Sequence, residues 1–150
     1  MTQLQFRIEH TEDYNVLEEL FIKSGIEVGN EPIVTEKLKC WKAVHDHGGV
    51  GTLIGGAILG KRGAYYVVDG IAVEPEYRKM KIGTIMLDKL VEYAKEIGIK
   101  KLWLMAKAPG FFKNYGFATV KREDAPNIFG CFNCDRYGKD CKPEPMVLDL

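Results

Sequence analysis

The chain has 150 residues, of which 46% are hydrophobic and 28% charged, with a formal net charge of zero. These values favour a single globular domain over residues 1–150 and exclude a disordered chain. The balanced charge argues against a protein that binds nucleic acid, and no apolar run approaches the roughly 20 residues that span a membrane. The N-terminus lacks a signal-peptide pattern, so we expect a cytoplasmic protein whose cysteines stay reduced.

The N-terminal part predicts a strand followed by two helices. Residues 4–8 alternate apolar and polar side chains, which is typical of a half-buried strand. Thr11 is a candidate N-cap for a helix whose apolar face repeats at helical spacing and which ends at Gly25. A second short helix is predicted from about Val34 to Trp41.

Glycine-punctuated β-like sequence follows. Residues 46–49 predict a hairpin turn before a strand at 50–59, and a second turn leads into a strand over Tyr65 to Val73. Gly70, inside this last strand, predicts a bulge or a close approach of another group to the backbone.

The C-terminal half begins with a change of period. From Ile82 the apolar residues recur every three or four positions, which predicts an amphipathic helix closed by Gly98. Further on we predict strand 102–105, a brief helix 111–115, strand 117–120, an irregular cysteine-containing loop at about 122–142 and a C-terminal strand from Met146.

The segment over residues 69–84 carries the strongest chemical signal. A strand ends at Val73, Pro75 prevents its continuation, and a short basic turn leads directly into the helix that begins at Ile82. The first turn of a helix offers unpaired N–H groups and a partial positive charge, and Gly83 leaves room for a close ligand. The pattern predicts an anion site, with a solvated helix start as the alternative.

This segment resembles the central motif of the GNAT superfamily of acetyl-CoA-dependent N-acyltransferases. The resemblance rests on Ile71-Ala72-Val73, on Pro75 to Arg78, and on the glycine-containing turn that ends at Gly83-Thr84. Lys81 departs from the motif because it stands where the family usually has its first glycine. A second stretch, Ala108 to Phe117, is similar to the family's Ala-x-x-Phe-Tyr-x-x-x-Gly-Phe segment.

The resemblance implies an α/β (α+β) fold with a mixed, mostly antiparallel sheet of six to seven strands and about four helices. It also implies acetyl-CoA as cosubstrate and suggests a homodimer. The pantetheine arm would lie along the central strand, where the backbones of Ile71 and Val73 would also polarise the thioester. The residues expected at the cofactor are Ile71, Ala72, Val73, Arg78, Lys79, Met80, Lys81, Ile82, Gly83, Thr84 and Phe112.

The proton-transfer groups are predicted with alternatives. The family's usual acid is a tyrosine at the position of Phe112, which cannot donate a proton, so Tyr115 or solvent would protonate the leaving thiolate. A carboxylate on or near the central strand is the usual base. Asp69 is favoured over Glu74 because an acid between apolar strand residues is costly without a partner or a role.

Three clustered cysteines suggest a second chemistry. Cys131, Cys134 and Cys141 have the spacing of a partial zinc site, for which Cys40, His45 or His47 could supply a fourth ligand. Ordinary thiols or a disulfide are the alternative.

The leading hypothesis is therefore an N-acetyltransferase that acts on the primary amine of a small or amino-acid-like molecule. Glu27, Glu31 and Glu36 could form an acidic rim that attracts such an amine, although charge runs of this kind are usually solvated surface. A non-catalytic acyl-CoA-binding regulatory domain and a metal-binding interaction module remain as alternatives.

Overall fold

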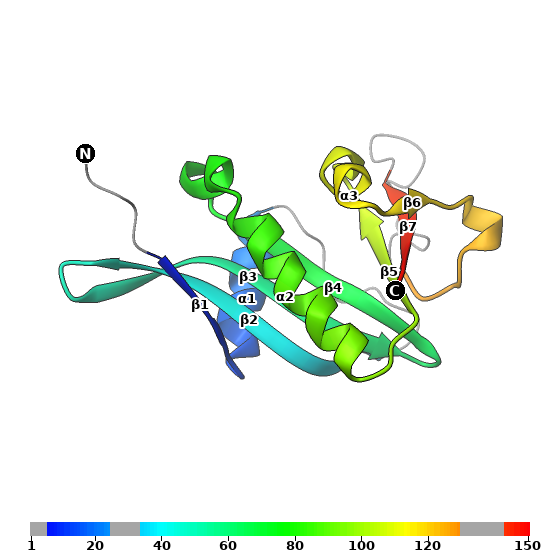
Figure 1. The fold of residues 1–150 in the computed structure, drawn as a ribbon, viewed down its shortest axis with the longest axis horizontal. Coiled ribbons are helices and arrows are strands. Elements are labelled where there is room, and N and C mark those ends of the chain that lie inside the picture. Colours follow the sequence, from blue (N-terminus) through cyan, green and yellow to red (C-terminus); the bar gives the residue numbers. More distant parts are fainter. Residues whose placement is uncertain (1–5, 25–33, 130–142) are drawn as a thin grey trace.

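One twisted sheet organises the chain (Figure 1). The computed structural model describes residues 6–24, 34–129 and 143–150. Within these ranges seven strands lie in the order β1-β2-β3-β4-β5-β7-β6, and every pairing is antiparallel except that of β4 with β5. The strands are β1 Phe6–His10, β2 Glu36–His47, β3 Val50–Arg62, β4 Tyr65–Val73, β5 Lys101–Ala106, β6 Ala118–Thr119 and β7 Glu144–Asp149. The expected mixed, mostly antiparallel sheet is confirmed.

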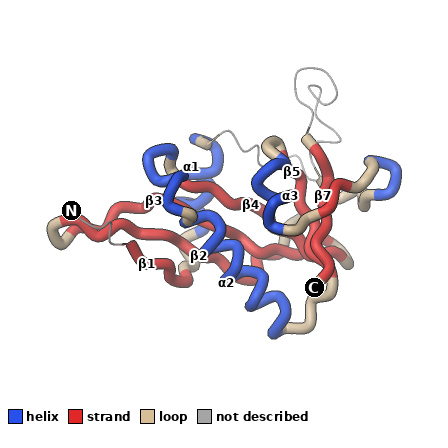
Figure 2. Tube along the Cα trace, turned by 45° about the horizontal axis from the view of Figure 1, so that its top comes forward, coloured by secondary structure: helices blue, strands red, loops and turns tan. Residues whose placement is uncertain are grey.

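Two long helices cover opposite faces of the sheet (Figures 1 and 2). A Cβ atom built on Gly55 of β3 would lie 3.0 Å from Met86, whereas one built on Gly56 would lie 2.5 Å from Leu17. Because successive strand residues point to opposite faces, α2 and α1 lie on different sides. The α-helices in the described ranges are α1 Tyr14–Lys23, α2 Ile82–Glu96 and α3 Pro109–Tyr115, and the 3-10 helices are η1 Pro75–Met80 and η2 Arg122–Asp124.

The predicted second helix at 34–41 is wrong, because this segment begins strand β2. Consecutive residues here are buried on opposite faces: Cys40 packs in the cluster beneath α1 and Trp41 in the larger core beneath α2. This double burial hides the alternation that identifies a strand. The strand forms because Glu36 to His47 pair with β3, a partner distant in sequence.

The start of α1 is also corrected. Asp13, not Thr11, is the N-cap, and its carboxylate accepts a hydrogen bond from the amide of Val16 at 3.4 Å. The Thr11 hydroxyl accepts instead from the amide of Asp13 at 3.1 Å. The side chains of Thr11 and Asp13 thus each accept a hydrogen bond from a backbone amide at the N-terminus of α1.

Most other predicted elements are confirmed within a few residues. The β2–β3 hairpin turns at Gly48 and Gly49, both with positive φ, as a type I′ turn requires. Strand β6 is shorter than the predicted 117–120, because the amide of Phe117 donates to the carbonyl of Phe112 in α3 at 2.9 Å instead of to a strand.

The main core lies between the sheet and α2. Its largest fully buried members include Trp41, Met86, Leu90 and Leu102. In the described parts of the chain, no helix combines the length and the apolar character needed to cross a membrane.

Candidate active site

Strands β4 and β5 separate after a short contact. Their parallel pairing joins only Tyr66 with Leu102 and Val67 with Trp103, and beyond it the strands run apart (Figure 1). The divergence begins beside a bulge in β4: Val68 pairs with Leu59 of β3 and Gly70 with Ile58, which leaves Asp69 as the extra residue. The predicted bulge is therefore confirmed, and β4 keeps an unpaired edge toward β5.

The direction of the free backbone groups follows from the pairing of β4 with β3. Glu74 donates its amide to the carbonyl of Ile54 at 2.7 Å, in register with the pair Val73–Gly55. In an antiparallel ladder, hydrogen-bonded and non-hydrogen-bonded pairs alternate. Ala72 therefore bonds toward β3, whereas the N–H and C=O groups of Ile71 and Val73 point toward the edge that β5 has left.

The turn after β4 connects these backbone groups to the N-terminus of helix α2. Arg78, Lys79 and Met80 lie in η1, and the side chain of Arg78 donates from Nε to the carbonyl of Val73 at 3.0 Å. That contact occupies one lone pair of a carbonyl on the free edge. Met80 is 43% exposed.

Lys81 forms the joint between η1 and α2. It has φ 59° and ψ 22°, and no other non-glycine residue of the described chain has positive φ. This left-handed conformation is the one that glycine adopts without strain, which explains why glycine is usual at this position of the motif. The turn is thus built here with a lysine, and the amides of Ile82, Gly83 and Thr84 follow as the first turn of α2.

Three elements meet around Gly83. A Cβ atom built there would lie 3.5 Å from the ring of Phe111 in α3 and 3.7 Å from Val73 of β4, both ordinary contact distances. Phe111 is 39% exposed, while Phe112 is half-buried and packs against Phe117 with ring centroids 5.6 Å apart. The protein itself leaves room for a methyl group at Gly83, so close packing does not explain the glycine.

Asp69 lies at the bulge and is ion-paired with Arg62. Arg62 is only 5% exposed; its Nε donates to the Thr35 hydroxyl at 2.7 Å and its Nη1 to the carbonyl of Ile128 at 2.8 Å. This burial of Arg62 could not be predicted from the sequence, because Lys61-Arg62-Gly63 is typical of a turn. The ion pair offsets the free-energy cost of placing a carboxylate among apolar residues.

Glu74, the alternative base, is held at the end of β4. Both of its carboxylate oxygens lie 3.1 Å from Nζ of Lys23 at the end of α1. It is therefore engaged in linking α1 to the start of η1.

Tyr115 contacts α2. Its hydroxyl donates to Oδ1 of Asp88 at 2.7 Å, and burial, reinforced by this carboxylate and by Glu92, raises the pKa of the phenol above its usual value. Donation of this proton to a leaving thiolate requires exchange of the bond to Asp88. Neither Asp88 nor the exposed Phe111 was identified from the sequence, since both depend on how α3 packs.

The predicted zinc ligands Cys131, Cys134 and Cys141 lie outside the described residues. Within the described ranges, no three His, Cys, Asp or Glu side chains gather as a metal site. Cys40 is buried beneath α1, and this burial raises the pKa of its thiol to about 12. A free thiolate at Cys40 is therefore scarce at neutral pH.

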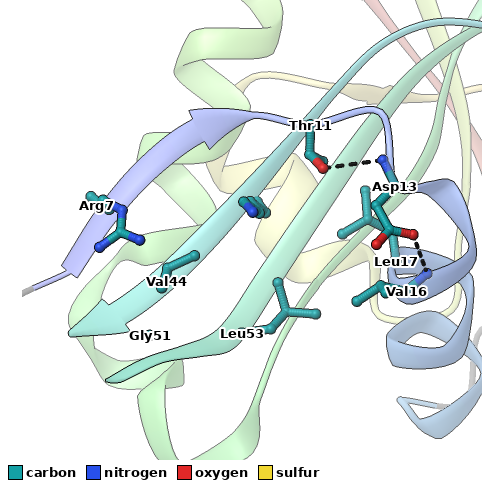
Figure 3. Close-up of a pocket in the computed structure, with 9 residues that line it drawn as sticks. Arg7, Thr11, Asp13, Val16, Leu17, Val44, Gly51 and Leu53 are labelled. Carbon is teal, nitrogen blue, oxygen red and sulfur yellow. Dashed lines mark hydrogen bonds between the residues drawn. The ribbon is translucent and has the colours of Figure 1, made fainter. Parts of the chain in front are cut away.

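A separate hollow of about 190 Å³ lies between β1–β3 and the start of α1 (Figure 3). Arg7, Thr11, Asp13 and Leu17 are among the residues that line it. Its charged groups have protein partners: Arg7 pairs with Asp46 and Asp13 caps α1. It does not include the free edge of β4 or the start of α2.

Comparisons with known proteins agree on the family. The family model described as "Acetyltransferase (GNAT) family" matches residues 7–117. An uncharacterized N-acetyltransferase of Chlorobaculum tepidum is 28% identical over 80 residues, and the alignment covers 49% of this chain and 52% of that relative. The chain thus matches about half the length of this curated relative.

Two solved structures illustrate the fold. An acetyltransferase of the GNAT family from Staphylococcus aureus superposes with a TM-score of 0.71 at 21% identity, over 97% of this chain and 99% of that one. N-acetylglutamate synthase from Neisseria gonorrhoeae, solved with coenzyme A and N-acetyl-glutamate, gives 0.63 at 20% identity, over 100% of this chain and 36% of that one. The chain belongs to the acetyltransferase (GNAT) family, as the strand–turn–helix motif indicated.

Proposed function

We propose that this protein transfers the acetyl group of acetyl-CoA to the primary amine of a small, amino-acid-like molecule. The observation that carries the proposal is the continuity of two backbone surfaces: the free edge of β4 and the first turn of α2, joined by η1. The edge can pair with the amides of pantetheine, and the helix start can bind the diphosphate.

The basic residues strengthen this cofactor assignment. Arg78, Lys79 and Lys81 bring positive charge to the same segment as the helix N-terminus, although the whole chain is neutral. A diphosphate is attracted by both the helix dipole and these cations. Because the whole chain has zero net charge, the residues other than these three cations are net negative together, which limits unspecific binding of other polyanions.

The reaction would proceed by direct attack. The amine nitrogen bonds to the thioester carbon, the carbonyl oxygen gains negative charge, and the C–S bond then breaks to give an amide and CoA thiolate. The amide N–H groups of Ile71 and Val73 point to the free edge, where they can donate to that oxygen. First, the ammonium form of the amine gives one proton to a base. Second, the leaving thiolate gains a proton, which is balanced by the further proton that the nitrogen loses as the amide forms.

Asp69 is our candidate for the base that accepts the first of these protons. It occupies the bulge beside the point where β4 and β5 separate, and Arg62 holds its carboxylate in place. In Asp69→Asn we expect kcat to fall at least tenfold with little change in the KM for acetyl-CoA. An unchanged pH profile of kcat/KM would remove Asp69 from this role.

For the second proton, Tyr115 and solvent are the candidates. Tyr115→Phe distinguishes them, since loss of a required acid lowers kcat, whereas solvent protonation leaves it unchanged. A free thiol with a pKa near ~8.5 is a fair leaving group without an acid.

The acceptor class is inferred from a neighbour. The synthase from Neisseria gonorrhoeae was solved with an N-acetylated amino acid, and its likeness to this chain spans the whole chain. We infer an amino-acid-like acceptor on this basis, and we carry over neither glutamate itself nor the rest of that longer protein.

The decisive experiment has two stages. Calorimetry first measures CoA binding to the purified protein. Thiol release from acetyl-CoA is then followed with a panel of amino acids and simple amines, with a reaction lacking amine as control. We expect binding and amine-dependent thiol release matched by acetylated product. No binding would contradict the whole proposal, whereas binding without turnover by any amine would leave a non-catalytic CoA-binding domain.

A further inference from the structure

A hydrogen bond joins the turn η1 to a distant strand. The hydroxyl of Tyr77, in the middle of η1, lies 2.9 Å from Nδ1 of His45 on β2. The two rings also pack edge to face, with centroids 5.5 Å apart and planes at 67°. Both side chains are half-buried, so this contact is shielded from water on part of its surface.

The turn η1 needs such support. It is a six-residue 3-10 helix, a form with poorer hydrogen-bond geometry than an α-helix, and it ends at the strained Lys81. Within the turn the other bonds are local, since the amide of Tyr77 donates to Glu74 at 2.9 Å and Arg78 reaches Val73. Glu74, just before the turn, is held by the carbonyl of Ile54 on β3 and by Lys23 of α1. These bonds hold the start of the turn, and the bond from Tyr77 adds a tie to the sheet at the middle of the turn.

The contact with His45 ties the middle of η1 to the sheet, because it joins Tyr77 to a strand residue 32 positions earlier in the sequence. His45 lies two residues before the end of β2, in a strand bonded on both sides, to β1 and to β3. A group on this strand is therefore a fixed point relative to the sheet. The η1 turn connects the free edge of β4 to the amides of Ile82 and Gly83 at the start of α2.

We propose that His45 is a positioning residue for the diphosphate of acetyl-CoA, acting through Tyr77. The bond holds η1 so that the amides at the start of α2 point at the diphosphate before the cofactor arrives. A site that is competent for only part of the time binds its ligand more weakly by that fraction. The inference rests on the proposed function, since it assigns a role within CoA binding.

The test removes the bond while keeping the rings. Tyr77→Phe deletes one oxygen, and His45→Phe deletes the nitrogen while leaving an aromatic ring against Tyr77. Two acetyl donors are compared: acetyl-CoA and S-acetylpantetheine, which lacks the diphosphate. We expect each variant to raise the KM for acetyl-CoA and the calorimetric Kd for CoA about fivefold, with kcat nearly unchanged.

The two donors separate positioning from general damage to the fold. With S-acetylpantetheine we expect the kcat/KM of both variants to equal that of the parent, and the double variant should lose no more than either single one. Tyr65→Phe, at the far end of β4, and His47→Phe, the exposed neighbour of His45, are matched controls that should bind CoA normally.

Three results decide the inference. Equal losses with both donors, or unchanged CoA affinity in Tyr77→Phe, would overturn the positioning role while leaving the proposed function intact. Failure of the parent protein to bind CoA would instead overturn the proposed function, and with it this inference.

Discussion

Gly70 and Gly83 stand on either side of the turn that joins β4 to α2, and their surroundings differ. At Gly70 a Cβ atom would lie 2.5 Å from the ring of Phe21, which is itself buried. At Gly83 the nearest atom would be 3.5 Å away. The first glycine is required by the packing of α1 on the sheet. The second is not required by packing within the protein, and we propose that a ligand is the reason for it.

The regions around these glycines differ in the same way. The bulge beside Gly70 brings together side chains from several parts of the chain: the buried Phe21 and Arg62 and the half-buried Asp69. The helix start at Gly83 is mainly backbone and lies next to an exposed ring, that of Phe111. We therefore expect substitutions at the bulge to change stability, and substitutions at the helix start to change ligand binding.

The largest effect is expected at the bulge pair. Asp69→Ala leaves the buried Arg62 without this carboxylate, and we expect a loss of about 3 kcal/mol in the free energy of unfolding. Denaturant unfolding measures it. The double variant Arg62→Met/Asp69→Leu should recover part of the loss, since both charges are removed. A loss below about 1 kcal/mol in the single variant would show that the pair is not a structural element.

The next largest effect is expected for Gly70→Ala. We expect the free energy of unfolding to fall by about 2 kcal/mol, because the added methyl group overlaps Phe21 and the ring must shift. Thermal or denaturant unfolding gives the value. In a Phe21→Leu background the added cost should shrink, since the smaller side chain can yield. Equal costs in the two backgrounds would mean that the clash with Phe21 is not the cause.

Gly83→Ala should give the opposite pattern. We expect the Kd for CoA to rise about tenfold, or about 1.4 kcal/mol, while the unfolding free energy stays equal or increases slightly because alanine favours the helix. Calorimetry and unfolding are measured on the same preparation. A normal CoA affinity in Gly83→Ala would remove the ligand-based reason for this glycine.

The smallest expected change is at Lys81. Lys81→Gly should stabilise the fold by about 1 kcal/mol, because glycine adopts φ 59° without strain. Lys81→Ala is the matched control, since it removes the same charge but keeps Cβ, and it should bring no gain. Comparable stability in the two variants would assign the effect to charge rather than to backbone conformation.

Much of the segment proposed to bind CoA could be predicted from the sequence, because it is built from residues that are neighbours in the chain. The end of β4 at Val73, the break at Pro75, the basic turn and the periodicity from Ile82 are read directly from neighbouring residues. The acid–base groups could not be settled in this way. Tyr115 and Asp69 were predicted by position, but their partners Asp88 and Arg62 are brought to them by packing between separate elements.

The sequence by itself determined the family and the strand–turn–helix, and it predicted a bulge or a close approach at Gly70, because each depends on the conformational preferences of a few adjacent residues. Only the tertiary structure decided that residues 36–41 form a strand, that β4 and β5 part after Val67, and that Arg62 is buried. Pairing and burial are set by partners far away in the chain, and those partners can outweigh local preference.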